Sequence, residues 1–435
     1  MKKELIILCI AVVNVSTLFA QHPLSLSQQQ CRQMALDYNE MLKKADNKVR
    51  QAELDKAVAF ASYLPKFEGS LTGTYLFPDM DVMGSELQMR GMYMAGISLI
   101  QPVYSGGKIR TANKLAEIGE ECAKEQLRKT RMDVIAEADK AYWTYVAVLE
   151  KVKMLDSYEK QMLALYDMAS ESVNAELSTE NDLLRISAKR SEIQYQLQKV
   201  RNGADLCRIS LCHVIGAGFD TMIEPVDTVL KINAPSEMSE DISSRPEFRL
   251  LQKQVDAGLQ QVKLARADIL PTIGLSAGYA YYGNVKLNGV AMDALGNAHP
   301  YTQKFDDGFG LAMASVSIPV FSWGAGLKKI KKARIEAENA RLDMTHNVKL
   351  MNIEVRQAVQ NVKDGYQLVQ TATIGLQLAE RNLQQMTQKY EVSMATLTDL
   401  LDAQSQWQTA KSNFIEAQTQ YKIYETEYLK KTGKL

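Results

Sequence analysis

The sequence predicts a mainly α-helical protein with membrane β-strands, in which one unit of helix, β-hairpin and long helical hairpin occurs twice. No proline occurs over 103–224 or over 320–435 of the 435 residues. Because turns depend on proline and glycine, these two blocks favour very long helices over a compact α/β enzyme. Segments of about ten residues that alternate in polarity follow Pro65 and Pro271, as membrane β-strands require.

The composition excludes several classes of function. Lys+Arg and Asp+Glu both total 51, so the chain lacks the basic excess of a nucleic-acid binder. No phosphate-binding glycine loop and no set of nucleophile, base and orienting acid is present, so we expect neither an enzyme nor a cofactor. The four histidines have no metal-ligand spacing, so no metal site is expected. They are His22, His213, His299 and His346.

Residues 1–20 read as a secretory signal peptide cut after Ala20. Lys2 and Lys3 form a basic start, and an apolar core of Leu5–Val13 follows that is too short to span a bilayer. After residue 20 no stretch reaches 18 apolar residues, so no transmembrane helix is expected. The remaining cysteines all fall in helical patterns and are predicted to be buried free thiols. They are Cys31, Cys122, Cys207 and Cys212.

The chain contains an internal duplication. An offset of 217 carries Gln101–Ser105 onto Ile318–Ser322 and Asp182–Leu184 onto Asp399–Leu401. We therefore predict a first structural repeat over 21–244 and a second over 245–435. Leu64-Pro65 matches Leu270-Pro271 at an offset of only 206, so the second repeat has 11 extra residues, which we expect in a longer loop near 283–305.

Each repeat is predicted to contain the same elements in the same order. The first has a helix over about 26–62, a β-hairpin over about 66–101 and a long helical hairpin with its tip near 174–181. The second has a helix over about 246–268, a β-hairpin over about 272–318 and a helical hairpin with its tip near 391–398. A half-buried soluble hairpin would show the same strand alternation, so the strands alone do not prove a membrane location.

The helix after the first hairpin carries a heptad pattern. Apolar residues recur at spacings of four and three, which is typical of a left-handed coiled coil. They are Val134, Ala138, Ala141, Tyr145, Val148, Val152 and Leu155. The helix is predicted over 108–176 and would be about 100 Å long. A compact globule does not need such a rod, whereas a protein that crosses a gap does.

The hairpin strands predict a barrel shared between chains. The edge strands, around Leu71 and Met313, cannot stay unpaired in hydrocarbon, and four strands cannot close a barrel. Two chains would supply eight strands, whose interior side chains fill, while three would supply twelve and leave room to conduct. The pattern thus predicts a shared barrel joined to a long helical tube.

The junctions and the second tip resemble those of the TolC-like outer-membrane efflux proteins, the outer membrane factors of tripartite export systems. The strand-to-helix signature is present as Gln101–Gly107 and again as Ile318–Gly324. Arg245-Pro246-Glu247 opens the second repeat, and Tyr390–Gln404 is similar to the family's tip. The resemblance implies a homotrimer with a twelve-stranded outer-membrane β-barrel and a periplasmic α-barrel. It also implies docking to a periplasmic adaptor and an inner-membrane transporter.

The resemblance places Asp399 and Asp402 at the pore constriction. The offset pairs Asp182 with Asp399 and Arg185 with Asp402, so we expect a ring of Asp182 and Asp399 and a latch between Arg185 and Asp402. The alternative is that each side chain only makes contacts within its own helix. Ser393 and Glu176 stand where the family usually has glycine. The tips are expected to dock the adaptor through Leu177, Ser178, Met394, Ala395 and Thr396.

We therefore expect a passive outer-membrane exit duct of a tripartite efflux or type I secretion system. The alternative is a periplasmic coiled-coil adaptor or structural protein without a channel, but an adaptor would need a β-rich domain between its helices, where 177–203 predict only a turn and a helix. Met89, Met92 and Met94 are interpreted as strand packing rather than as a soft-metal path. Aromatic residues at strand ends fit a membrane girdle or ordinary packing. They are Tyr75, Tyr93, Tyr104, Tyr281 and Trp323.

Overall fold

The computed structural model describes residues 23–82, 85–176, 179–227, 232–292, 295 and 297–435. The chain divides into two compact units. The first contains Glu125–Leu250, Thr345–Leu435 and the N-terminal residues up to Asn47, and is helical apart from two short strands. The second contains Lys48–Lys124 and Leu251–Met344 and holds the long β-strands. The signal peptide predicted over 1–20 lies outside the described residues.

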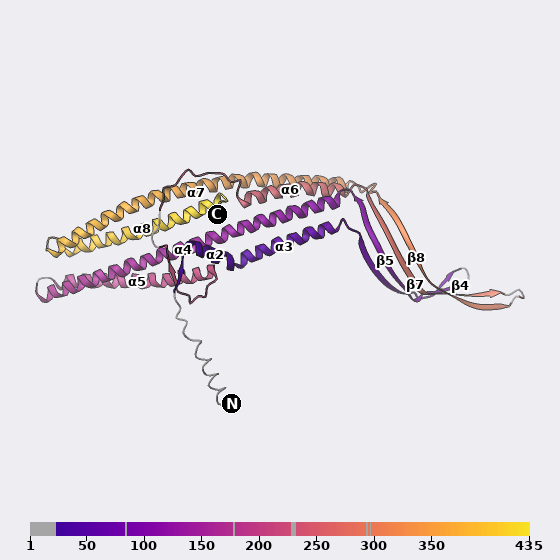
Figure 1. Cartoon of the computed structure of the whole chain (residues 1–435), viewed down its shortest axis with the longest axis horizontal. Helices are drawn as coiled ribbons and strands as arrows, with labels where there is room; N and C mark the ends of the chain where they lie inside the picture. The colour runs from indigo at the N-terminus through magenta and orange to yellow at the C-terminus, as the bar shows by residue number, and fades with distance from the viewer. Residues whose placement is uncertain (1–22, 83–84, 177–178, 228–231, 293–294, 296) are drawn as a thin grey trace, which may run out of the picture. The chain divides into compact units, whose positions relative to one another are not determined.

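Two long helical hairpins account for most of the helix. The first joins α4 (Lys108–Asn174) to α5 (Glu180–Ile215), and the second joins α7 (Ala325–Glu391) to α8 (Leu397–Lys431). In Figure 1 the two helices of each hairpin lie side by side. Both α4 and α7 have 67 residues, and their ends are related by the offset of 217 that the sequence shows. The predicted long helices are thereby confirmed.

The core of the first unit forms along α4, at its heptad positions and beside them. Ala138, Tyr142 and Val146 are at most 2% exposed and pack against α5 and the N-terminal elements. The Tyr142 hydroxyl donates to the carbonyl oxygen of Leu26 at 3.0 Å, so its polar end is satisfied inside the core. Burial of Cys31 in this cluster raises the pKa of its thiol to about 12. That thiol is therefore an inert, free cysteine, as predicted.

The other cysteines follow the prediction in part. Cys122, Cys207 and Cys212 are all free. Cys212 is buried, but Cys122 and Cys207 are only half-buried, which corrects the expectation that all four thiols lie inside the core.

A buried acidic side chain ties three helices of the same unit together. Asp139 on α4 is 1% exposed and accepts hydrogen bonds from Arg32 Nε at 2.7 Å and Nη2 at 2.5 Å. Thr426 on α8 donates to the same carboxylate at 2.7 Å. Because a buried carboxylate is costly unless paired, this set fixes α2 (Gln28–Tyr38), α4 and α8 in one arrangement. The sequence analysis missed Asp139, which directly follows the heptad residue Ala138.

The helix predicted over 26–62 is wrong in detail, because it is two helices. They are α2 (Gln28–Tyr38) and α3 (Glu40–Ala61), separated at Asn39. The Asn39 side-chain oxygen accepts from the backbone N–H groups of Met41 at 2.9 Å and Leu42 at 3.1 Å. Asparagine forms such local bonds readily, so it caps the second helix and ends the first.

The structure contains two short strands that the sequence analysis did not predict, one before α2 and one after α5. They are β1 (Leu24–Leu26) and β6 (Ile223–Pro225), and they pair in parallel with Leu24 opposite Ile223. Three residues are too few to show an alternating pattern, so the sequence carries no strand signal there.

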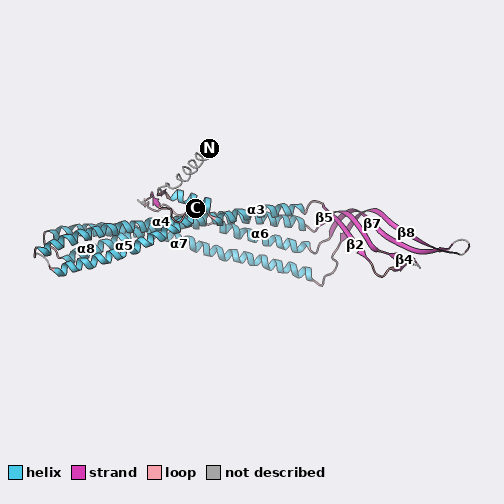
Figure 2. Ribbon diagram, turned by 90° about the horizontal axis from the view of Figure 1, so that it is seen from below, coloured by secondary structure: helices cyan, strands magenta, loops and turns pink. Residues whose placement is uncertain are grey.

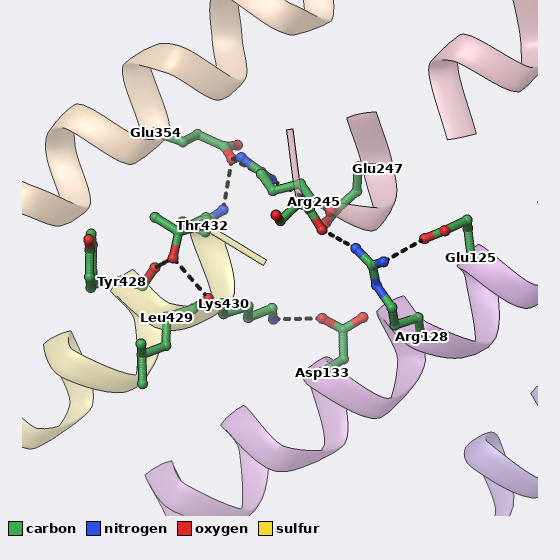
Figure 3. A network of polar contacts seen from close by, with 12 residues as sticks. Glu125, Arg128, Asp133, Arg245, Glu247, Glu354, Tyr428, Leu429, Lys430 and Thr432 are labelled. Carbon is green, nitrogen blue, oxygen red and sulfur yellow. Dashed lines mark hydrogen bonds and ion pairs between the residues drawn. The ribbon is translucent and has the colours of Figure 1, made fainter. Parts of the chain in front are cut away.

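The second repeat opens with α6 (Pro246–Ala267), which confirms the helix predicted over 246–268. The buried Arg245 precedes it and donates through Nη1 and Nη2 to Glu354 Oε2 on α7, each at 3.0 Å. Lys431, at the end of α8, donates to the same oxygen at 3.0 Å. Figure 3 shows Arg245 directed toward Glu354. One carboxylate therefore joins α7, the end of α8 and the start of α6.

The C-terminal residues complete this network. Lys430 forms an ion pair with Asp133 on α4 at 2.6 Å, and Arg128 donates to the carbonyl oxygen of Ser244 (Figure 3). Gly433 has φ +74°, and a Cβ placed there would lie 2.5 Å from the Ser244 carbonyl oxygen. Glycine is thus required where the chain end passes the start of α6.

The second unit contains a sheet with four long strands. They are β2 (Lys66–Tyr75), β5 (Arg90–Ser105), β7 (Thr272–Met292) and β8 (Ala298–Ser317). These strands lie side by side in the order β2-β5-β7-β8, all antiparallel (Figure 2). Two short strands, β3 (Met80–Val82) and β4 (Ser85–Gln88), extend the far part of β7. Edges at β2 and β8 confirm the predicted edge strands.

The register gives the sheet one continuous apolar face. Phe67, Leu99, Ala277 and Ala312 are successive cross-strand partners on it, and Gly69, Ile97, Tyr279 and Gly310 form the next row. The opposite face carries Glu68, Ser70, Thr72 and Thr74 on β2. A sheet with one face that is apolar across all four long strands fits a wall that meets lipid on that side. Met313 belongs to the face opposite Leu71, because it pairs with Ser276.

The longer loop predicted near 283–305 is wrong, because most of these residues extend the two strands. Pairing between β7 and β8 shifts between Tyr282 and Val285 and then continues to Met292 opposite Ala298. At the shift Asn284 has φ +63°, and its backbone N–H donates to the carboxylate of Asp306 at 2.6 Å. After this bulge, residues 285–288 read Val-Lys-Leu-Asn and alternate between apolar and polar, as a strand does. The inserted residues therefore lengthen the strands.

Candidate gate at the helical tips

The first tip joins α4 to α5. Glu176 ends the first helix with φ +61°, and Thr179 is the N-cap of the second. The Thr179 hydroxyl accepts from the backbone N–H of Asp182 at 3.3 Å and donates to its carboxylate at 2.9 Å. Asp182 is therefore held at the helix start, where a negative charge favours the helix dipole. Leu177 and Ser178, predicted to dock the adaptor, lie outside the described residues.

The second tip repeats this chemistry at the offset of 217. Ser393 has φ +58°, and Thr396 caps α8. Thr396 and Asp399 form a reciprocal capping box: the Asp399 N–H donates to the threonine hydroxyl at 3.2 Å, and the Thr396 N–H donates to the carboxylate at 3.1 Å. Hydrogen bonds from Thr396 hold the pKa of Asp399 below its usual value. Asp399 thus carries a full negative charge at neutral pH.

An apolar cluster holds the two hairpins together behind these tips. Tyr158, Met162 and Ile186 come from the first hairpin and are fully buried. Leu397 and Leu400, from the first turn of α8, pack against them. Because these residues follow the caps directly, packing of the cluster fixes the direction in which both helix starts point.

One contact of the predicted latch residue crosses between the hairpins. Arg185 on α5 is exposed, and its Nη1 donates to the hydroxyl of Thr398 on α8 at 3.0 Å. Thr398 stands one helical turn before Asp402, which is also exposed. The structure therefore brings Arg185 to the tip segment that carries Asp399 and Asp402. The pairing of Arg185 with Asp402 between chains stays a prediction, as does the ring of Asp182 and Asp399.

The predicted docking residues of the second tip are accessible to different degrees. Met394 is 77% exposed, Thr396 is exposed and Ala395 is half-buried. The sequence analysis missed the capping roles of Thr179 and the bridging role of Thr398. A Thr-x-x-Asp pattern, present as Thr179–Asp182 and Thr396–Asp399, is a known signal of a helix start and could have identified the caps.

The rest of the described chain adds no second chemical site. Among the residues that the structure describes, no three His, Cys, Asp or Glu side chains are grouped to hold a metal ion. None of the described helices has a stretch apolar and long enough to cross a bilayer. Residues 180–215 form the single helix α5, which leaves no room for the β-rich domain of the adaptor alternative.

The structure has two helical hairpins that pack together and carry capped acidic tips. It also has four long strands with open edges and one apolar face. Together these features define the class of membrane exit channels that further copies of the chain complete. The family described as outer membrane efflux protein matches residues 31–217 and 238–432. The outer membrane efflux protein BepC of Brucella suis is 21% identical over 396 residues, which cover 89% of this chain and 81% of BepC.

Two further comparisons agree. The alkaline protease secretion protein AprF of Pseudomonas aeruginosa is 20% identical over 76% of this chain and 67% of its own length. The crystal structure of CusC superimposes with a TM-score of 0.79 at 13% identity and covers 96% of this chain and 95% of CusC. This chain belongs to the outer membrane efflux protein family. It is therefore an efflux protein of the outer membrane.

Proposed function

We propose that the protein is a passive exit duct gated at its helical tips, and that it catalyses no reaction itself. The observation that supports this most directly is the duplicated cap, because it places one fixed carboxylate, Asp182 or Asp399, at each of two tips in one chain. In a homotrimer the two carboxylates give 3 × 2 = 6 acidic groups at one level. Like charges so placed repel one another and attract cations.

The proposed latch acts against this repulsion. Arg185 reaches α8 of its own chain through Thr398, so its guanidinium already lies at the tip segment that carries Asp402. In the trimer we propose that it pairs with Asp402 of a neighbouring chain. Both side chains are exposed, so each pair would contribute at most about 1 kcal/mol. Three pairs would suffice to favour a closed state without locking it.

Single-channel conductance in a planar lipid bilayer tests the latch. We expect Arg185→Ala and Asp402→Ala each to raise the mean conductance, and the double variant to add little beyond either single change, because both remove one interaction. Lys189→Ala, one turn further along α5, is the matched control and should leave conductance unchanged. Additive effects, or unchanged conductance in both single variants, would remove the latch.

The kind of export system that the duct serves is inferred from the similarity to BepC and AprF. BepC is an efflux protein by its name, and AprF is an alkaline protease secretion protein. We infer that this chain serves a tripartite efflux or a type I secretion system. Export measured in a deletion strain complemented with this chain, with transporters of each kind supplied in turn, distinguishes the two.

A further inference from the structure

The start of α7 carries a dense group of positive charge. Residues 325–334 contain five basic side chains and no acidic one, a formal charge of 5 − 0 = +5. All five are exposed, and together they are called the basic cluster here: Lys328, Lys329, Lys331, Lys332 and Arg334. They follow closely on β8, which ends at Ser317.

The first repeat provides an internal comparison. The corresponding segment, 108–117, has three basic residues and one acidic residue, a formal charge of 3 − 1 = +2. There Lys108 forms an ion pair with Asp268 at 3.3 Å, and Lys114 forms one with Glu117 at 2.7 Å. Long helices after a strand therefore do not need the basic cluster, since the first copy folds without it.

Most of the basic cluster lacks such partners within the chain. Lys332 lies 3.6 Å from Glu336, and both side chains are largely exposed. For the other four side chains, no carboxylate of the described residues lies within 4.0 Å. The second repeat thus presents mostly unpaired positive charge, whereas both lysines of the corresponding segment of the first repeat are paired.

An apolar segment precedes the basic cluster. Val320 is 89% exposed, Phe321 73% and Trp323 86%, and the two rings lie with centroids 5.1 Å apart. Trp323 has φ +50°, whereas Gly106 occupies the corresponding position of the first repeat with φ +61°. A bulky residue in this conformation is strained, which is tolerated chiefly where function requires it. Tryptophan is enriched at the membrane–water interface.

We propose that residues 318–334 form a binding surface for anionic phospholipid headgroups in the leaflet on the helical side of the outer membrane. Val320, Phe321 and Trp323 would enter the interface, and the basic cluster would contact the phosphates. The positive end of the α7 dipole adds to the attraction. This inference rests on the outer-membrane assignment, because the segment directly follows β8, which ends at Ser317.

Charge complementarity selects this occupant. Juxtamembrane lysines and arginines are attracted to anionic lipid, and each contributes roughly a fivefold gain in affinity. The other candidate occupant is a neighbouring copy of the chain. A neighbour would have to supply five compensating acids in one place, whereas a leaflet supplies anionic groups to every exposed side of the helix.

Lipid retention by the detergent-solubilised full-length trimer tests the proposal. The trimer is mixed with equimolar phosphatidylglycerol and phosphatidylcholine, and the lipids that stay bound are counted by native mass spectrometry. We expect the unchanged protein to retain phosphatidylglycerol in preference. Lys328→Gln with Lys329→Gln should reduce this preference about 25-fold, since each lysine contributes about fivefold. High salt should reduce it as well.

Two matched variants make the test specific. Lys349→Gln with Lys363→Gln removes two exposed charges further along α7 and should leave the preference unchanged. Lys328→Arg with Lys329→Arg keeps the charge and should keep the preference. An unchanged preference in the first variant, or an equal loss in the control, overturns the proposal. Dissociation of the trimer with an unchanged lipid ratio also overturns it and assigns the lysines to a neighbouring chain.

Bilayer conductance of the same preparations separates this proposal from the channel function. A variant that conducts normally but has lost its preference for phosphatidylglycerol supports lipid binding. A trimer that conducts normally and shows no preference in its unchanged form overturns lipid binding and leaves the channel function intact.

Discussion

At the scale of single residues, the two tips hold a side chain in a backbone conformation that favours glycine. Glu176 has φ +61° and Ser393 φ +58°, and the offset of 217 relates the two positions. Both residues follow the last turn of a long helix and reverse the chain toward a threonine cap. The tip geometry is therefore set by the turn as a whole, at some cost in backbone strain.

Replacing Ser393 with glycine should stabilise the second tip. Removing the strain at positive φ outweighs the added freedom of the unfolded chain, and we expect a gain of about 1 kcal/mol. Thermal unfolding of the purified trimer measures this. The control is Ser405→Gly inside α8, which should cost about 0.5 kcal/mol. A loss of stability in Ser393→Gly would show that the serine side chain holds the turn.

The Glu354 carboxylate, which joins α7, α8 and the start of α6, should make the free energy of unfolding depend on pH. Burial raises the pKa of Glu354, but hydrogen bonds from Lys431 and Arg245 outweigh it, so the pKa lies below its usual value. A lowered pKa contributes stability that is complete above the usual pKa of glutamate and is lost as pH falls through the lowered one.

Glu354→Gln should therefore lower the free energy of unfolding at neutral pH by about 1 kcal/mol, since the group is partly exposed. The deficit should shrink as the pH falls below about 4. Glu338→Gln, an exposed change on the same helix, serves as control. A deficit that stays constant down to acidic pH would show that Glu354 does not contribute through its charge.

At the scale of elements, the sequence predicted long, strongly periodic segments well and short ones poorly. The heptad pattern and the missing prolines fixed α4 and α7 to within a few residues. The break at Asn39 was missed because its signal is one side chain that bonds to its own backbone. The eleven inserted residues were assigned to a loop because an insertion alone does not show whether it lengthens the strands.

The contacts of the predicted site residues were not predicted. The offset of 217 located Asp182 and Asp399, yet their partners are the adjacent threonine caps. The contact between Arg185 and Thr398 could not be predicted, because it depends on how two hairpins more than 200 residues apart pack. The buried pair of Arg32 and Asp139 has the same origin.

The tip of the second hairpin should bind the adaptor. Met394 is 77% exposed just after a 67-residue helix, so its apolar side chain packs little against the residues that the structure describes. Met394→Glu should abolish export while the trimer still assembles in the outer membrane, as judged by fractionation and a heat-labile band on a gel. Glu391→Gln is the nearby control. Normal export by Met394→Glu would count against tip docking.

At the scale of the whole molecule, the four long strands need partners from other chains. The edges β2 and β8 are both left open, and their register assigns Leu71 and Ala312 to the same apolar face, whereas Met313 belongs to the other. Three copies would supply 3 × 4 = 12 strands, which closes the sheet and leaves a conducting lumen.

An interchain crosslink tests this shared barrel most directly. With a cysteine at Leu71 and a second one in turn at Ala312, Ala314 or Val316, oxidation in outer membranes should give a covalent ladder that ends at three chains. Leu71→Cys paired with Met313→Cys, on opposite faces, should crosslink poorly. The account predicts the three-chain product for at least one same-face pair. Only intrachain products at every register, or a ladder that continues beyond three chains, would contradict it.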